Sequence, residues 1–162
     1  ARPFADLMPI PQDLQVESGF WGKDTEKQKE MDAIYKANKE KHGYANWYDW
    51  CNAKWGTKWD VTEGDANIDP DGKSCYGWFE TAWGPGIAAY EKLEEAGFEL
   101  DVTYFEPGMC FAGRYKDGED NCYEYNFENE NWRDEIDDEE VRYLLEYEYD
   151  SWKEWQDEEE AQ

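Results

Sequence analysis

Four tryptophans lie within 13 consecutive residues, at positions 47, 50, 55 and 59, in a chain of which 35% of the residues are charged. A chain this polar has few aliphatic side chains with which to build a core, so we expect a few large rings to supply most of it. On a helix, Trp47, Trp50 and Cys51 share one face, which favours core packing. The alternative is a groove that stacks on a peptide or on bases. Base stacking also needs a cationic groove, and this chain is strongly negative.

The second constraint is the charge. The 162 residues contain 41 acidic and 16 basic side chains, for a net charge of -25. Residues 117–162 hold 20 of the acidic but only three of the basic side chains, so the C-terminal part is the more acidic. Such a field repels nucleic acids and anionic membranes and attracts basic proteins. We therefore expect no direct binding to nucleic acid or membrane, and a protein partner with a basic surface.

Hydrophobic periodicity and turn residues predict the local structure. Prolines exclude a helix interior from residues 1–16, and turn formers predict a loop over 64–74. The remaining segments are predicted as helices over 24–42, 45–55, 85–96 and 137–156, and as strands over 57–61, 75–82, 98–106, 109–115 and 121–127. This order predicts an α+β domain over residues 1–156, in which helices cover one face of an antiparallel sheet, followed by a frayed acidic tail over residues 157–162.

Four longer motifs occur in order along the chain: MPIPQDL, NWYDWCNAKWGTKWDV, FETAWGPG and YFEPGMCFAGRY. Together they resemble the YubB-like ferredoxin-like domain family of phage and plasmid proteins. The resemblance runs from Met8 to Tyr115. It implies a ferredoxin-like α+β fold and an origin in a mobile element. It brings no catalytic residues to carry over. We expect a cytoplasmic location in an infected or plasmid-bearing bacterium.

No pattern typical of an enzyme or a cofactor site is present. The cysteines, at positions 51, 75, 110 and 122, have no C-x-x-C spacing, and with His42 as the one histidine we expect no metal site. We expect reduced and mostly buried thiols. Asn67, Asp69 and Asp71 match the start of a calcium-binding loop, but Trp78 stands where that loop needs a bidentate glutamate. A plain loop is the favoured interpretation, and we expect neither enzymatic activity nor a cofactor.

The acidic C-terminal region is the best candidate site. Its predicted partner-binding carboxylates are Asp134, Glu135, Asp137, Asp138, Glu139, Glu140, Glu146, Glu148, Asp150 and Glu154. Aromatic side chains that could anchor a partner are Tyr143, Tyr147, Trp152 and Trp155. The plain interpretation is a solvated helix face. The functional one is that rows of carboxylates on a rigid helix imitate the phosphates of a nucleic acid.

The sequence therefore favours a non-enzymatic phage or plasmid accessory protein that binds and inhibits a host nucleic-acid-handling protein. Inhibition of a CRISPR effector or a restriction enzyme by nucleic-acid mimicry is the concrete hypothesis. The alternative is a small-ligand-binding or enzymatic module that uses the tryptophan-rich WYDW and FETAW segments as a pocket.

Overall fold

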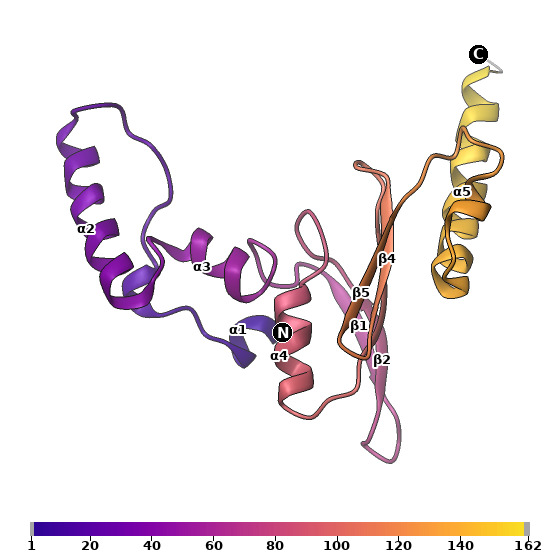
Figure 1. Ribbon diagram of the computed structural model, residues 1–162, viewed down its shortest axis with the longest axis horizontal. Coiled ribbons are helices and arrows are strands. Elements are labelled where there is room, and N and C mark those ends of the chain that lie inside the picture. Colours follow the sequence, from indigo (N-terminus) through magenta and orange to yellow (C-terminus); the bar gives the residue numbers. More distant parts are fainter. Residues whose placement is uncertain (1, 161–162) are drawn as a thin grey trace. The chain divides into compact units, whose positions relative to one another are not determined.

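The computed structural model of the chain describes residues 2–160 (Figure 1). Contacts divide the chain into two compact units, residues 1–93 and 94–162, and each is described by itself. Helix α4 (Ile87–Glu95) crosses the division. The prediction of one domain over residues 1–156 stays a prediction.

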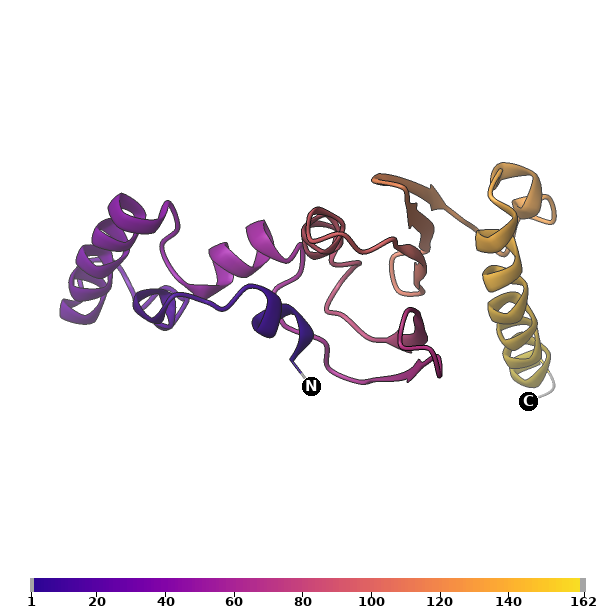
Figure 2. The same cartoon turned by 90° about the horizontal axis from the view of Figure 1, so that it is seen from below.

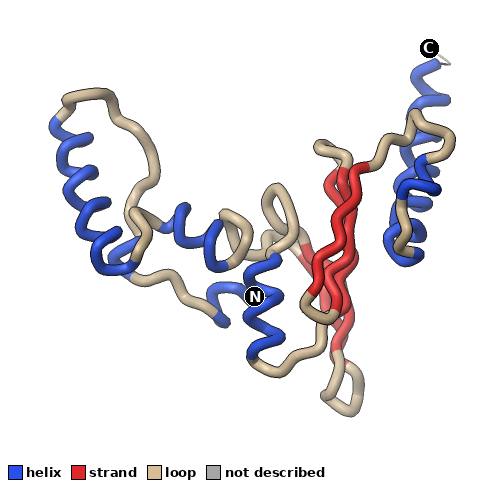
Figure 3. The backbone as a smooth tube through the Cα atoms, in the orientation of Figure 1, coloured by secondary structure: helices blue, strands red, loops and turns tan. Residues whose placement is uncertain are grey.

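The α+β class is confirmed. The strands form two antiparallel sheets, one of two strands and one of three (Figure 3). Within each sheet the strands follow one another along the chain without a helix between them. The two-stranded sheet consists of β1 (Gly64–Ile68) and β2 (Cys75–Phe79), and the three-stranded sheet of β3 (Asp101–Glu106), β4 (Phe111–Lys116) and β5 (Glu119–Glu124). A ferredoxin-like arrangement is not confirmed by these two sheets.

The N-terminal segment is partly helical, although its prolines predicted no helix interior over residues 1–16. Helix α1 (Pro3–Leu7) starts on Pro3, where the missing N–H costs nothing, and the N–H groups of Phe4 and Ala5 donate to the carboxylate of Asp60 at 3.1 and 2.8 Å. A carboxylate at this end of a helix satisfies free donors and suits the helix dipole. Phe4 is buried, as is Leu14 in the 3-10 turn η1 (Gln12–Leu14).

Helix α2 (Glu26–His42) confirms the helix predicted over residues 24–42. The Thr25 hydroxyl accepts the N–H of Gln28 at 3.1 Å, and Gly43 ends the helix with a φ of 82°. The buried side chain of Asn38 donates to the carbonyls of Asp13 and Ala45, both at 2.9 Å. These bonds attach the segments on either side of α2 to it.

The tryptophan cluster divides between core and surface. In α3 (Trp47–Lys54), Trp50 and Cys51 are buried, and Trp55, just after the helix, is buried as well. The Trp50 and Trp55 rings meet edge to face at 5.6 Å, and the Trp55 indole donates to the Met8 carbonyl at 3.1 Å. Trp59, by contrast, is half exposed. Core packing therefore holds for part of the cluster only.

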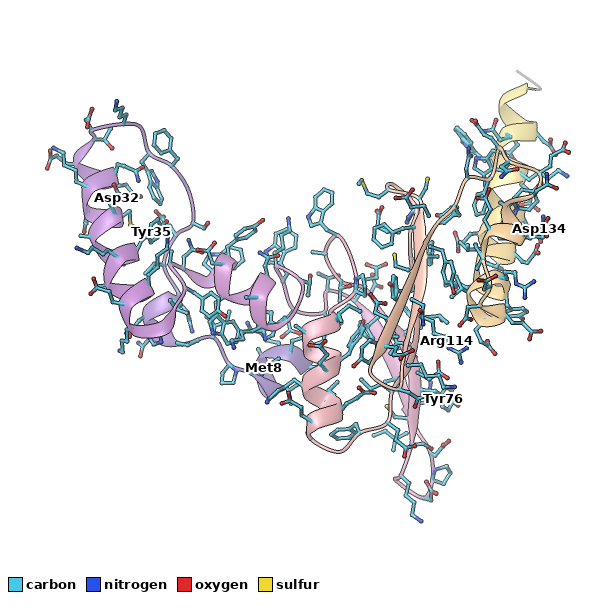
Figure 4. The ribbon with its side chains drawn as sticks, viewed as in Figure 1. Met8, Asp32, Tyr35, Tyr76, Arg114 and Asp134 are labelled. Carbon is cyan, nitrogen blue, oxygen red and sulfur yellow. The ribbon has the colours of Figure 1, made fainter. Side chains whose placement is uncertain are left out.

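The predictions for residues 57–82 need two corrections. Residues 57–61 form no strand, and the predicted loop over 64–74 contains strand β1, which pairs with β2 along its whole length. Gly77 allows this pairing, because a Cβ atom there would lie 2.0 Å from the Asp65 carbonyl oxygen. Both strands are exposed, and Figure 2 and Figure 4 show the hairpin, with Tyr76 labelled in Figure 4.

The 94–162 unit contains the predicted antiparallel meander. Asp117 and Gly118 form the two-residue turn between β4 and β5, and both have the positive φ (52° and 77°) that this type of hairpin turn requires. The β3–β4 connection is longer than predicted, since four residues separate Glu106 from Phe111.

The core of this unit lies between the sheet and helix α5 (Glu139–Glu160), which packs against β3 and β4. The buried residues at its centre are Ala112, Tyr125, Trp132, Ile136, Val141 and Leu145. The predicted helix over 137–156 is thus confirmed. It continues past residue 156 to Glu160, so residues 157–160 of the predicted tail are helical, and residues 161–162 lie outside the described residues.

The four cysteines are free, and three of them correct the prediction that they are mostly buried. Cys51 is buried, and burial raises the pKa of its thiol to about 12. The other three, Cys75, Cys110 and Cys122, are exposed. No helix among residues 2–160 is both long and apolar enough to cross a bilayer.

Candidate protein-binding face

The candidate site begins at the start of α5, where Asp138 fixes the helix end. Its carboxylate accepts the N–H groups of Glu140 and Val141 at 2.9 and 3.1 Å. It also lies 3.4 Å from the guanidinium of Arg114 on β4, which points to the α5 side of the sheet (Figure 4). Asp138 therefore connects the helix to the sheet and has partners within the chain.

We expect Asp138→Ala to lower the free energy of unfolding by about 1–2 kcal/mol, because the variant loses the helix cap and leaves Nη1 of Arg114 without its carboxylate partner. Denaturant unfolding of the variant beside Asp137→Ala measures this, since Asp137 is exposed and caps no helix. Equal midpoints for the two variants would contradict the role given to Asp138.

Arg114 also holds the edge of the sheet through Asp101 on β3. Its Nε and Nη2 atoms donate to the two carboxylate oxygens at 2.7 Å each, and these bonds lower the pKa of Asp101 to about 2. The usual pKa of an aspartate in an unfolded chain is about 3.9. The stabilisation of the folded chain by the Asp101–Arg114 ion pair is thus complete above about pH 4 and is lost as the pH falls towards 2.

Acid unfolding of the wild type and of Asp101→Asn tests this pair. We expect the wild type to be more stable at pH 5, and the difference between the two proteins to shrink between about pH 4 and pH 2. A difference that stays constant from pH 5 to pH 2 would show that Asp101 is not held by Arg114 as described.

Two further predicted site residues have partners within the chain. Glu146 forms a two-bond ion pair with Arg133, in which Nη2 lies 2.6 Å from Oε2, and the Arg133 bonds lower the pKa of Glu146. Glu135 accepts the side-chain amide of Asn129 at 2.9 Å. These carboxylates hold the segment before α5 in place and are less available to a partner.

Glu148 is half buried, and this burial raises its pKa. The aromatic candidate Trp152 is also half buried. Its ring stacks on Tyr149 and lies 5.8 Å from the ring of Phe127, so it contributes to the core. Trp155 is exposed.

A row of exposed side chains runs along the side of α5 opposite its buried residues. Their spacing of three and four residues places them on one helix face, while Val141 and Leu145 point to the core. We call this row the outer face of α5; its residues are Glu140, Tyr143, Tyr147, Asp150 and Glu154. None of the three carboxylates forms an ion pair within the part of the chain that is described.

The remaining predicted carboxylates, Asp134, Asp137 and Glu139, are exposed in the segment before the helix and at its start, and Figure 4 labels Asp134 beside α5. The structure thus brings the exposed candidates together around one helix.

The charge density of α5 can be compared with that of a nucleic acid. Its 22 residues include ten acidic and two basic side chains, and at about 1.5 Å per residue the helix is about 33 Å long. This is one net negative charge per roughly 4 Å. DNA carries one charge per about 3.4 Å along each strand and per about 1.7 Å along the duplex. The helix therefore approaches the charge density of one strand.

The segment that resembles the start of a calcium-binding loop lies in the β1–β2 hairpin. There Asp69 accepts the Ser74 hydroxyl, and no group of three possible metal ligands occurs among the described residues.

The alternative hypothesis, a pocket formed by the WYDW and FETAW segments, is matched only in part. Trp47 of WYDW lines an open depression of about 620 Å³ together with residues of the N-terminal segment such as Arg2 and Pro9, but no residue of FETAW lines it.

Sequence reasoning missed one feature of the same region. The Lys58 ammonium lies over two tryptophan rings, 4.0 Å from the centroid of Trp59 and 5.1 Å from that of Trp83. The dipeptide Lys58–Trp59 is a weak signal, and Trp83 lies too far along the chain for its part to be predicted.

Comparison with protein-family models finds no matching family, and searches of curated proteins and of solved structures find no match either. The resemblance to the YubB-like family stays a prediction.

Proposed function

We propose that this chain is a non-enzymatic, acidic protein-binding module that inhibits a host nucleic-acid-handling protein. The outer face of α5 and the exposed carboxylates at its start would occupy the basic channel through which the target binds DNA or RNA. The observation that carries the proposal is the unpaired state of the three outer-face carboxylates in the described structure. A helix with about the charge density of one DNA strand offers such a channel a fixed array of negative charge.

Two exposed tyrosines lie between these carboxylates. Tyr143 and Tyr147 are 78% and 74% exposed, one helical turn apart. A tyrosine buries a large area with few rotatable bonds, so the pair can supply contact area at an interface that charge alone would leave weak.

The resemblance to the YubB-like family supports the finer parts of the proposal: a ferredoxin-like arrangement, a phage or plasmid origin and action in the bacterial cytoplasm. A CRISPR effector or a restriction enzyme is the expected class of target.

The proposal is tested by binding and by competition. Tagged chain captures its partner from a bacterial lysate at about 50 mM salt, and an oligonucleotide that the partner binds is then added. We expect the nucleic acid to release the chain, and the complex to weaken as salt screens the charges. A partner that binds the chain and the nucleic acid together, or a complex that ignores salt, would refute mimicry.

A further inference from the structure

Two tryptophan rings of the 1–93 unit surround one cation. Trp59 and Trp83 come from segments more than 20 residues apart, and both hold rings against the Lys58 ammonium. They are 51% and 74% exposed, unlike Trp50 and Trp55. A pair of exposed tryptophans around a positive charge is unusual for a surface, because rings of this size are normally buried.

The backbone holds the Trp83 ring in this position. Trp83 has a φ of 71°, in the left-handed region that bulky residues rarely adopt. Hydrogen bonds hold both sides of it: the hydroxyl of buried Thr57 donates to the Ala82 carbonyl at 3.0 Å, and that of Thr81 donates to the Gly84 carbonyl at 2.7 Å. Strain that neighbouring bonds maintain is typical of functional sites.

Lys58 itself is bound weakly. In a chain with 41 acidic side chains, it forms no ion pair with any described residue, and its ammonium contacts the two rings. An exposed cation–π contact favours its cation by a factor of only about 2 to 5. An ammonium is also strongly hydrated, so a less hydrated cation competes well for the same rings.

We propose that Trp59 and Trp83 form a binding site for a trimethylammonium group, with Lys58 as a resident cation that the ligand displaces. A methylated ammonium carries its charge on an apolar surface, which suits the faces of two indole rings. The group can belong to a free small molecule or to a methylated lysine of a protein. The site is independent of the proposed inhibition, since neither ring belongs to α5.

Titration with choline at 150 mM salt tests the site, with the indole N–H signals of the tryptophans followed by NMR. The neutral analogue 3,3-dimethylbutan-1-ol has the same shape and is the ligand control. We expect choline to shift the Trp59 and Trp83 signals and the alcohol to bind at least fivefold more weakly. Equal binding of the two compounds would overturn the proposal, since charge would then play no part.

Variants separate the site from the general attraction of a negative protein for cations. Lys58→Gln vacates the rings and should bind choline about 2 to 5 times more tightly. Lys73→Gln makes the same charge change at an exposed lysine of the hairpin turn and should bind like the wild type. Trp83→Leu keeps apolar bulk but has no aromatic face, and its affinity for choline should be at least tenfold lower than that of the wild type. Equal affinity of the two lysine variants, or unchanged affinity of Trp83→Leu, would refute the site.

A peptide with one trimethyllysine, beside the same peptide unmethylated, distinguishes the two sources of the group. If the methylated peptide binds more tightly than choline and the unmethylated peptide does not bind, the site is assigned to a protein ligand. Binding equal to that of choline assigns it to a free small molecule. A peptide that binds equally with and without its methyl groups contradicts the proposal.

Discussion

Replacing Trp132 with alanine is expected to destabilise the 94–162 unit by about 3–5 kcal/mol. The side chain is fully buried, and its ring lies 5.4 Å from that of Phe127 and 5.7 Å from that of Tyr149 on α5. Its removal leaves a cavity between the helix and the segment that precedes it. Because whole domains are stable by only about 5–15 kcal/mol, this one change removes a large share of what holds α5 in place.

Denaturant unfolding followed by circular dichroism measures the effect. The control is Trp155→Ala, since Trp155 lies on the same helix but is 53% exposed, and its loss should cost no more than about 0.5 kcal/mol. If the two variants unfold at the same denaturant concentration, the core described around Trp132 is wrong. The fixed geometry of the outer face of α5 would then lose its support.

Neutralising the outer face is expected to weaken partner binding by about 3- to 150-fold at low salt. The variant is Glu140→Gln, Asp150→Asn and Glu154→Gln, which removes three charges and little volume. Exposed ion pairs contribute about 0.2–1 kcal/mol each, and 1.4 kcal/mol corresponds to a factor of ten. Most of the change should come from slower association, because these charges act over a distance before contact.

The matched control neutralises three exposed glutamates outside the candidate site: Glu30→Gln, Glu40→Gln and Glu91→Gln. It changes the net charge by the same amount, so it measures what the overall field contributes. We expect the partner affinity of this control variant to be less than threefold lower than that of the wild type. Equal losses in the two triple variants would mean that net charge, and not the outer face, attracts the partner.

Local signals were enough to predict the four longer helices, α2 to α5, and the meander. The Thr25 cap and the Gly43 stop of α2 act within one turn of the residues they end, and the Asp117–Gly118 turn needs nothing outside itself. Strand β1 was missed because GDANIDPDGKS consists of turn formers, and its strand exists only through pairing with β2. Residues 57–61 look like a strand, but Asp60 there caps α1.

The negative charge of the candidate site could be predicted from the sequence, but which of its carboxylates form ion pairs within the chain could not. The sequence shows that carboxylates cluster after residue 116. It does not show that Arg114 and Arg133 engage Asp138 and Glu146, because both arginines lie more than ten residues away. Contacts over such distances along the chain depend on the packed fold. The helical spacing does place Trp152 on the same face as Leu145 and Tyr149, so its part in the core could be predicted.

The most direct test of the central claim is the salt dependence of partner affinity, measured for the wild type, the outer-face triple variant and the control triple variant between about 50 and 300 mM salt. If fixed negative charge on α5 is the working surface, affinity of the wild type and of the control falls steeply with salt, and that of the outer-face variant falls much less. If the affinities of all three proteins fall with salt to the same extent, the account is contradicted.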